Sequence, residues 1–195
     1  MTWLKSGGQD MNMDNDFPSL ETARLFLRPM STLDLEFVFR HFSDPDVNRY
    51  LLDEEPVTTL EQAQDIIDFY SSPEGKPYNR WVIIRKNDMR AVGTCGYHQW
   101  QKVHHRAEVG YDLEKNSWRQ GIMTEALRVM LQYGFDHMDL NRVEALVYQE
   151  NDASVRLLER LGFQKEGLLR QSFRQGDTYY DHWLLSLLKM EWTPR

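Results

Sequence analysis

The middle of the chain alternates strand and helix patterns in a way that limits how it can fold. Ala107 to Leu113 has the pattern of a strand, and a turn with one glycine, within Trp118 to Leu127, then leads into a helix that continues to about His137. A second strand, Val143 to Tyr148, precedes a second helix that begins at Asn151. Because N–H groups at a helix start lack internal partners and lie at the positive end of the dipole, the turn predicts a site for phosphate.

Patterns on both sides of this segment indicate an α/β fold with a mixed sheet. Two amphipathic helices are expected early in the chain, one capped by Ser31 or Thr32 and one running from Thr59 to Tyr70. The glycine of Leu161-Gly162-Phe163 predicts a Schellman end for the helix that begins at Asn151. The further strands are expected at Arg24 to Arg28, Trp81 to Arg85, Ala91 to Tyr97, Gly167 to Phe173 and Tyr179 to Leu188. We expect one domain over residues 17–195 and a flexible N-terminal arm over residues 1–16.

Composition excludes several classes of protein. A net charge of −7 argues against nucleic-acid binding and suits a cationic substrate, although solubility alone explains such a charge. The single cysteine, Cys95, excludes an internal disulfide and a multi-cysteine zinc site, and it favours a cytoplasmic setting. Its strand context predicts a buried thiol rather than a nucleophile. Neither a membrane helix nor a signal peptide is indicated, so we expect no membrane interaction.

Five segments follow one another in the order found in a known superfamily. They are Glu21 to Pro29, Ala107 to Tyr111, Trp118 to Leu127, Asn151 to Phe163 and Tyr180 to Trp192. In this order they resemble the Gcn5-related N-acetyltransferase (GNAT) superfamily, and within it the ribosomal-protein N-terminal alanine acetyltransferases and their relatives. The resemblance covers nearly everything from Phe17 on. It implies a GNAT-like, mostly antiparallel sheet of about seven strands, splayed between strands 4 and 5 and flanked by about four helices.

The resemblance also implies a cosubstrate, acetyl-CoA, bound in that splay. The residues expected to hold it are Leu113, Arg119, Gln120, Gly121, Ile122, Met123, Thr124 and Asn151. Main-chain amides from Gln120 to Thr124 can reach the pyrophosphate, while Arg119 adds charge and Asn151 bonds the pantetheine arm. The loop departs from the family pattern at Trp118, Arg119 and Met123, but amide donors do not depend on side chains.

The reaction implied is direct attack by a neutral amine on a thioester. The departing thiolate needs a proton or a hydrogen bond, and the position where many relatives have a tyrosine is Leu158. The resemblance therefore points to Ser154 as the catalytic hydroxyl. The alternative for both Ser154 and Asn151 is that they cap their own helix, and for Asn151 the two roles can coexist.

The general base is the second catalytic assignment. Amines carry a proton at neutral pH, because α-amino groups titrate near about 8. Glu108 leads as the base, with an exposed carboxylate paired to Arg106 or a neighbour as the alternative. The other candidates are Glu144, Glu150 and His98, whereas the acid that some relatives carry on the sixth strand is replaced here by Phe173. No metal is expected, since His104 and His105 point to opposite sides of a strand.

The acceptor amine is not fixed by the sequence. Specificity is expected from the two early helices, from Asp44 to Thr58, from Ser71 to Asn79 and from the turn at Gly176. A protein N-terminus, an amino sugar, a polyamine and an amino acid are all compatible, and the protein is expected to be a monomer or a homodimer. The alternative function is a catalytically silent acyl-CoA-binding module. A nucleotide phosphotransferase is discounted because Ile122 follows Gly121, where a Lys, Ser or Thr would be needed.

Overall fold

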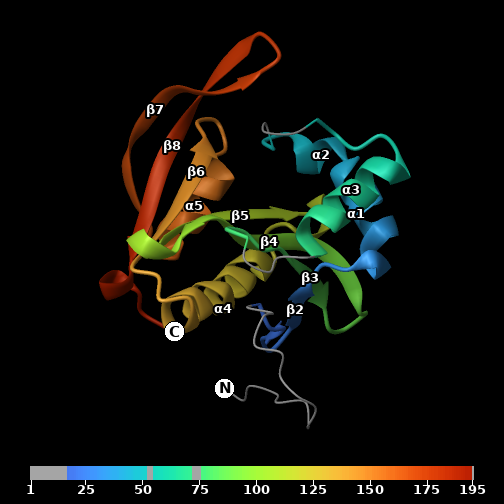
Figure 1. Ribbon diagram of the computed structural model, residues 1–195, viewed down its shortest axis with the longest axis horizontal. Coiled ribbons are helices and arrows are strands. Elements are labelled where there is room, and N and C mark those ends of the chain that lie inside the picture. The colour runs from blue at the N-terminus through green and yellow to red at the C-terminus, as the bar shows by residue number, and fades with distance from the viewer. Residues whose placement is uncertain (1–16, 52–54, 72–75, 195) are drawn as a thin grey trace.

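The computed structural model describes residues 17–51, 55–71 and 76–194 and contains an eight-stranded sheet with helices on both faces (Figure 1). The expected arm, residues 1–16, lies outside these ranges. The strands are β1 (Leu20–Glu21), β2 (Leu25–Pro29), β3 (Trp81–Arg85), β4 (Arg90–Gln101), β5 (Arg106–Leu113), β6 (Arg142–Tyr148), β7 (Gln164–Gln175) and β8 (Thr178–Leu188). The helices are α1 (Leu35–Phe42), α2 (Pro45–Asn48), α3 (Leu60–Ser71), α4 (Ile122–His137) and α5 (Asp152–Arg160), with short 3-10 turns between some elements.

The sheet is mixed but almost wholly antiparallel, as expected. Its strands follow the order β1-β2-β3-β4-β5-β6-β8-β7, and β5 and β6 form the parallel pair. Those two strands pair only from Arg106 to Glu108 on β5 and from Arg142 to Glu144 on β6. Beyond this point β5 stays with β4 as far as Leu113, and β6 stays with β8 as far as Tyr148. The sheet therefore splays between β5 and β6, which Figure 1 shows as two sets of strands that diverge.

Each face of the sheet has its own hydrophobic core. The buried residues of α4, among them Ala126 and Leu127, belong to one core with Val109 and Val143. The buried residues of α1 and α3 belong to a second core. This core includes Val82 and Ile84 of β3 and neighbouring residues of β2 and β4. Since successive strand side chains alternate, the polar residues between the core positions of β5 and β6 lie on the α3 side. We call these two sides the α4 face and the α3 face.

Several elements depart from the expected boundaries. The sheet has eight strands rather than about seven, because the two-residue β1 pairs with β2. The segment Asp44 to Thr58, expected as loop, contains α2, which starts at Pro45 and is capped by the Asp44 side chain accepting from the N–H of Asp46 at 2.8 Å. Ser31 precedes a 3-10 turn that leads into α1. A capping residue and a proline at the first helical position were signals that could have identified α2.

The end of α5 agrees with its sequence pattern. Gly162 has a φ of +98°, and the N–H of Phe163 donates to the carbonyl of Leu158 at 3.0 Å. The N–H of Gly162 also donates to the carbonyl of Glu159 at 3.0 Å. These are the two hydrogen bonds of a Schellman motif, so the predicted helix end is confirmed.

Candidate functional site

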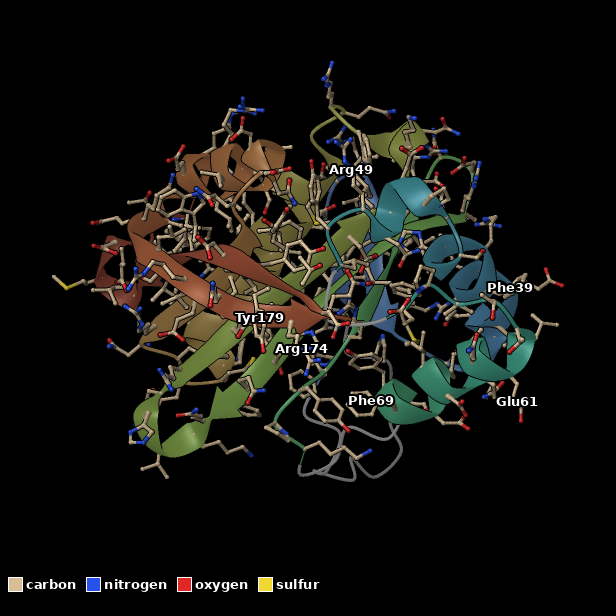
Figure 2. All side chains as sticks on the ribbon, turned by 90° about the horizontal axis from the view of Figure 1, so that it is seen from above. Phe39, Arg49, Glu61, Phe69, Arg174 and Tyr179 are labelled. Carbon is tan, nitrogen blue, oxygen red and sulfur yellow. The ribbon has the colours of Figure 1, made fainter. Side chains whose placement is uncertain are left out.

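A cleft of about 1300 Å³ opens where β5 and β6 part. Its walls come from the segment after α1, from β4 to β6, and from the starts of α4 and α5. All expected site residues line it except Gln120, namely Glu108, Leu113, Arg119, Gly121, Ile122, Met123, Thr124, Asn151 and Ser154. Figure 1 shows the tip of the β7–β8 hairpin projecting beyond the rest of the sheet, and Figure 2, seen from above, labels Arg174 and Tyr179 near that tip and Arg49 and Phe69 on the side of α1 to α3.

The turn before α4 presents backbone donors to this cleft. Gly121 has a φ of +74°, a left-handed conformation that glycine adopts without strain. The first i to i−4 hydrogen bond of α4 runs from the N–H of Glu125 to the carbonyl of Gly121 at 3.0 Å. The N–H groups of Ile122, Met123 and Thr124 therefore precede the helical ladder and are available to an anion.

Side chains around this turn hold it in place. Glu125 binds Arg24, with Nε to Oε2 at 2.6 Å, and accepts from the Thr22 hydroxyl at 2.6 Å. Burial alone would raise the pKa of Glu125, but the hydrogen bonds from Thr22 and Arg24 lower it. The backbone carbonyl of Gln120 accepts from Arg24 Nη1 at 3.1 Å, and the Gln120 side chain donates to the carbonyl of Asn116 at 2.7 Å. Arg24, just before β2, thus supports the turn through Glu125 of α4, a contact that sequence spacing does not reveal.

Trp118 occupies the position where the family pattern has arginine or glutamine. Its indole Nε1 donates to the carbonyl of Leu113, the last residue of β5, at 2.7 Å. The side chain remains 42% exposed. The indole therefore ties the turn to the end of β5 and leaves the backbone donors of the turn accessible.

The start of α5 brings a pair of hydroxyl groups to the splay. Asn151 caps the helix, since its Oδ1 accepts from the N–H of Ser154 at 3.2 Å. The Ser154 hydroxyl has a different partner, Tyr111 of β5, at an Oη to Oγ distance of 2.6 Å. Burial raises the pKa of Tyr111 far above its ordinary value, and the hydrogen bond to Ser154 offsets only part of this effect. The phenol stays protonated at neutral pH and can donate to Ser154.

The α3 face of the splay carries the groups considered as bases. Glu108 lies between His98 of β4 and Glu144 of β6 in the strand register. Glu144 accepts from Arg142 Nε at 2.6 Å and from Arg106 Nη1 at 3.4 Å, so two arginines already occupy its carboxylate. Glu150 does not line the cleft, although it was also a candidate. Glu108 and Glu144 form the last β5–β6 pair before the strands part, and His98 lies on the other side of Glu108, on β4.

Aromatic rings continue the α3 face beyond these polar groups. The ring of Tyr148, at the end of β6, lies 5.6 Å from that of Tyr50 and 6.0 Å from that of His182. The Phe173 ring lies 4.6 Å from His182. All four rings line the cleft. Tyr50 follows α2, so the early helices and the closing hairpin meet at one wall, in the region expected to determine specificity.

A buried ionic network underlies His98. Asp112 of β5 pairs with Arg80 and with His41 of α1, the latter at an Nε2 to Oδ1 distance of 2.6 Å. It also accepts from the hydroxyl of Thr94 at 2.7 Å. Although burial alone would raise the pKa of Asp112, the charge of Arg80 and the contacts with His41 and Thr94 lower it well below its ordinary value. The carboxylate therefore stays ionised and fixes Arg80 beneath the cleft.

Further cations line the cleft near the starts of α4 and α5. Arg156 and Arg160, one turn apart on α5, line it together with Arg119. Arg156 lies 3.6 Å from Asp152, but both side chains are largely exposed. These two arginines were not among the expected site residues, although their four-residue spacing on a helix was a signal for a shared face.

Comparison with known proteins identifies the chain. Residues 24–164 match the model of a family described as acetyltransferase (GNAT) domain. The protein belongs to the GNAT family. This GNAT protein is 41% identical over 176 residues to the uncharacterized N-acetyltransferase p20 of Bacillus licheniformis, covering 89% of this chain and 98% of that one. It is an acyltransferase of the N-acetyltransferase class.

Solved structures agree with the fold of this GNAT protein. A GNAT-family acetyltransferase from Bacillus anthracis superposes with a TM-score of 0.78 at 26% identity, covering 89% of this chain and 99% of that one. Spermidine N-acetyltransferase from Vibrio cholerae, solved in complex with CoA and spermine, gives a TM-score of 0.77 at 21% identity over 87% of this chain and 98% of that one. The second likeness concerns the fold alone.

The described residues hold neither a metal-binding cluster nor a membrane-spanning helix. Residues 17–51, 55–71 and 76–194 contain no group of three or more His, Cys, Asp or Glu arranged to hold a metal ion. Within the same ranges, no helix is both long and apolar enough to cross a membrane.

Proposed function

We propose that this GNAT protein transfers the acetyl group of acetyl-CoA to a primary amine by direct attack in the β5–β6 splay. One observation carries the proposal: the splay joins an anion-binding helix start to a hydroxyl pair on its α4 face and a carboxylate on its α3 face. Acetyl transfer to an amine needs these three groups, because the cosubstrate carries a pyrophosphate, the amine must lose a proton and the thiolate must be stabilised.

The residues around the splay fit acetyl-CoA. Past Glu108 of β5 and Glu144 of β6, the facing edges of the two strands no longer pair with each other. Their backbone groups can bond an extended arm that carries amide groups of its own, as pantetheine does. The N–H groups of Ile122 to Thr124 suit the pyrophosphate, and Arg119, Arg156 and Arg160 add positive charge at the same end.

The two faces of the splay divide the chemistry. On the α3 face, Glu108 accepts a proton from the incoming ammonium group, directly or through water, and the amine nitrogen then forms a bond to the acetyl carbonyl carbon. On the α4 face, Ser154 donates a hydrogen bond to the sulfur as the carbon–sulfur bond breaks. Tyr111 donates to Ser154 Oγ in this assignment, which leaves the serine proton directed toward the leaving group.

The acceptor is a primary amine of a protein N-terminus or a small molecule that approaches over the α3 face. The carboxylate of Glu108 and the aromatic wall around Tyr148 support a cationic amine, since ring faces attract cations. The net charge of the chain is also negative, which favours the approach of a cationic amine.

Thiol release from acetyl-CoA in the presence of an amine panel tests the proposal. The wild type is expected to turn over at least one primary amine, and Glu108→Gln and Ser154→Ala are each expected to reduce kcat by about 100-fold, as removal of an acid or base does. The exposed Asp88→Asn variant, in the turn between β3 and β4, is the matched control and keeps wild-type rates. Tight CoA binding with no turnover of any amine would instead identify a silent binding module.

A further inference from the structure

His98 lies on the α3 face, where the absence of a side chain at Gly110 leaves room for its ring. It lies on β4 directly opposite Glu108 of β5, and its imidazole lines the cleft. The ring extends over Gly110, where a Cβ atom would lie 2.9 Å from His98 Nε2. Only glycine at position 110 leaves room for this ring, because real Cβ atoms do not approach so closely. The side chain is therefore fixed beside the proposed base.

Arg80 determines which nitrogen of His98 carries the proton. Arg80 Nη1 lies 3.1 Å from His98 Nε2. A guanidinium has donors and no acceptor, so Nε2 must accept. The proton of the neutral ring then resides on Nδ1. Over the described parts of the chain, no hydrogen bond to Nδ1 is formed, so this N–H is available to a molecule in the cleft.

Arg80 itself cannot move away from this role. It pairs with Asp112, and its Nε donates to Thr94 Oγ1 at 2.7 Å. Its guanidinium also lies 5.5 Å from the ring centre of Tyr70 on α3. These partners come from β4, β5 and α3, so the donor to His98 is held from three elements.

The surroundings of His98 disfavour its charged form. Burial and the charge of Arg80 lower the pKa of His98 to about 3, and the more distant Asp112 opposes this only partly. The facing groups are Arg80 ahead of β3, Glu108 and Asp112 of β5 and Tyr70 of α3. A ring that is neutral at pH 7, with Nε2 already occupied by a donor, has no basic nitrogen to offer.

We propose that His98 is a specificity-determining residue, whose Nδ1–H donates a hydrogen bond to an oxygen of the acceptor next to the reacting amine. This rests on the proposed function. Glu108 accepts from the amine while His98, its cross-strand neighbour, donates to the oxygen, since directly opposed side chains lie about 5 Å apart. The favoured acceptors are amines with a hydroxyl or a carbonyl on the adjacent carbon. A polyamine, which has only donors when protonated, cannot satisfy His98 and leaves its N–H without a partner.

Two substitutions distinguish the roles of the two ring nitrogens of His98. Asparagine places an amide nitrogen near the position of Nδ1, whereas glutamine reaches the position of Nε2. His98→Asn is expected to keep the donor to the acceptor, and His98→Gln is expected to keep the contact with Arg80 and lose that donor. Matched amines test both sources of oxygen: ethanolamine against propylamine for a hydroxyl, and glycinamide against ethylamine for a carbonyl.

The expected result is a change in the KM for the amine. His98→Gln raises the KM for the oxygen-bearing amine of at least one pair by about tenfold, the loss of one hydrogen bond, and leaves its partner amine and acetyl-CoA unaffected. His98→Asn stays within about threefold of wild type. Equal falls in kcat for every amine would place the donor on the thioester oxygen and overturn the proposal. An ionisation near pH 6 to 7 in kcat/KM that both variants abolish would make His98 a base and overturn it as well.

A measurement without turnover keeps the outcome separate from that of the proposed function. Nitrogen-15 NMR of the imidazole in the unliganded protein is expected to show a neutral ring protonated at Nδ1 at pH 7. An Nε2–H ring or an imidazolium would contradict the proposal even if acetyl transfer is found. Conversely, a silent CoA-binding module with the expected tautomer would refute the proposed function while leaving the state of His98 as described.

Discussion

At the scale of single residues, the consequential feature is the set of buried polar groups beneath the cleft. Asp112 and His41 have side chains that are 2% and 1% exposed, and Arg80 is nearly as buried. A buried charge is tolerated only when it is paired and hydrogen-bonded, and each oxygen of Asp112 has such partners. The network bears on the cleft because it holds Arg80, whose contact with Nε2 and whose charge disfavour the protonated form of His98.

The pH dependence of stability reports on His98. Its folded pKa of about 3 lies below the ordinary value near 6.5, so the unfolded chain binds a proton that the folded chain does not. Its contribution to stability is complete above about pH 6.5 and falls as the pH is lowered. Between pH 4.5 and 6, His98→Asn is expected to reduce the slope of unfolding free energy against pH by up to about 1.4 kcal/mol per unit. Urea titrations at several pH values measure this slope, and the exposed His104→Asn variant is the control. A slope that His98→Asn leaves unchanged would contradict the lowered pKa of His98.

The hydroxyl pair gives a second prediction at this scale. Tyr111→Phe removes the partner of Ser154 while keeping the ring, and kcat is expected to fall about tenfold with little change in the KM for acetyl-CoA. Steady-state kinetics measures both constants. Tyr97→Phe is the matched control, because its hydroxyl donates to the Met130 carbonyl within the core and is remote from the reacting groups. Equal losses in the two variants would indicate a general packing effect instead.

At the scale of elements, the site depends on how helix ends are held. The start of α4 is supported by the contact of its Glu125 with Arg24, just before β2, and the start of α5 is capped by Asn151. Both helix ends face the same splay because each follows a strand that borders it, β5 for α4 and β6 for α5. The positions of the N–H groups that can bind an anion, and of the serine hydroxyl, are therefore set by the strand ends and not by the bodies of the helices.

Loss of the support for α4 is expected to affect cosubstrate affinity. Glu125→Ala removes the partner of Arg24 and Thr22, and the Kd for CoA is expected to rise several-fold because the turn loses its fixed geometry. Isothermal titration calorimetry measures the affinity. Asp88→Ala, which removes an ion pair to Arg85 far from the turn, is the control and keeps the wild-type Kd. Unchanged CoA binding by Glu125→Ala would mean that the turn holds its shape without this contact.

The end of α5 provides a prediction about stability. Gly162→Ala places a side chain at a φ of +98°, and the free energy of unfolding is expected to fall by about 1 to 2 kcal/mol. The added Cβ meets no clash, since its nearest neighbour is Leu187 Cδ1 at 3.5 Å. Gly167→Ala, in β7 with open space around the added Cβ, is the matched control and changes stability by less than about 0.5 kcal/mol. Urea denaturation measures the free energy of unfolding of both variants. Equal effects would show that the left-handed conformation of Gly162 does not cause the loss of stability.

At the scale of the whole molecule, the proposed direct attack predicts that the acetyl group passes between two substrates in the splay without being bound to the protein. Cys95 is fully buried, and burial raises the pKa of its thiol far above the ordinary value. The described residues of the cleft place no thiol beside the parting strands. An acetylated cysteine is therefore not expected on the reaction path, and both substrates must be present before transfer.

Steady-state kinetics tests this order of events. Initial rates at varied acetyl-CoA and amine are expected to give intersecting double-reciprocal lines, and Cys95→Ala is expected to keep at least half of the wild-type kcat. Incubation with acetyl-CoA alone leaves the intact protein mass unchanged. Parallel lines together with a stable mass increase of one acetyl group would contradict direct attack.

The sequence predicted the arrangement of elements better than the details of the site. Strand and helix patterns are local, so α4, α5, the strands β3 to β5 and the Schellman end were recognisable from spacing alone. Contacts between distant segments were not. The support of Glu125 by Arg24 joins residues about a hundred positions apart, and the pairing of Tyr111 with Ser154 depends on the splay itself. The state of His98 likewise depends on Arg80, which no local pattern connects to it.

The alternation of side chains along β5 has a consequence for how this protein can diversify. Odd-numbered positions from Ala107 to Tyr111 belong to the α4 face and its core, while Glu108 and Gly110 lie on the α3 face, where we propose that the amine approaches. The same two-residue period separates Tyr148 from its neighbour Val147 on β6. Mutations at the even-numbered positions, on the α3 face, can change which amine is accepted while leaving CoA recognition and the core intact. Acceptor choice can thus drift between descendants of this gene faster than donor choice.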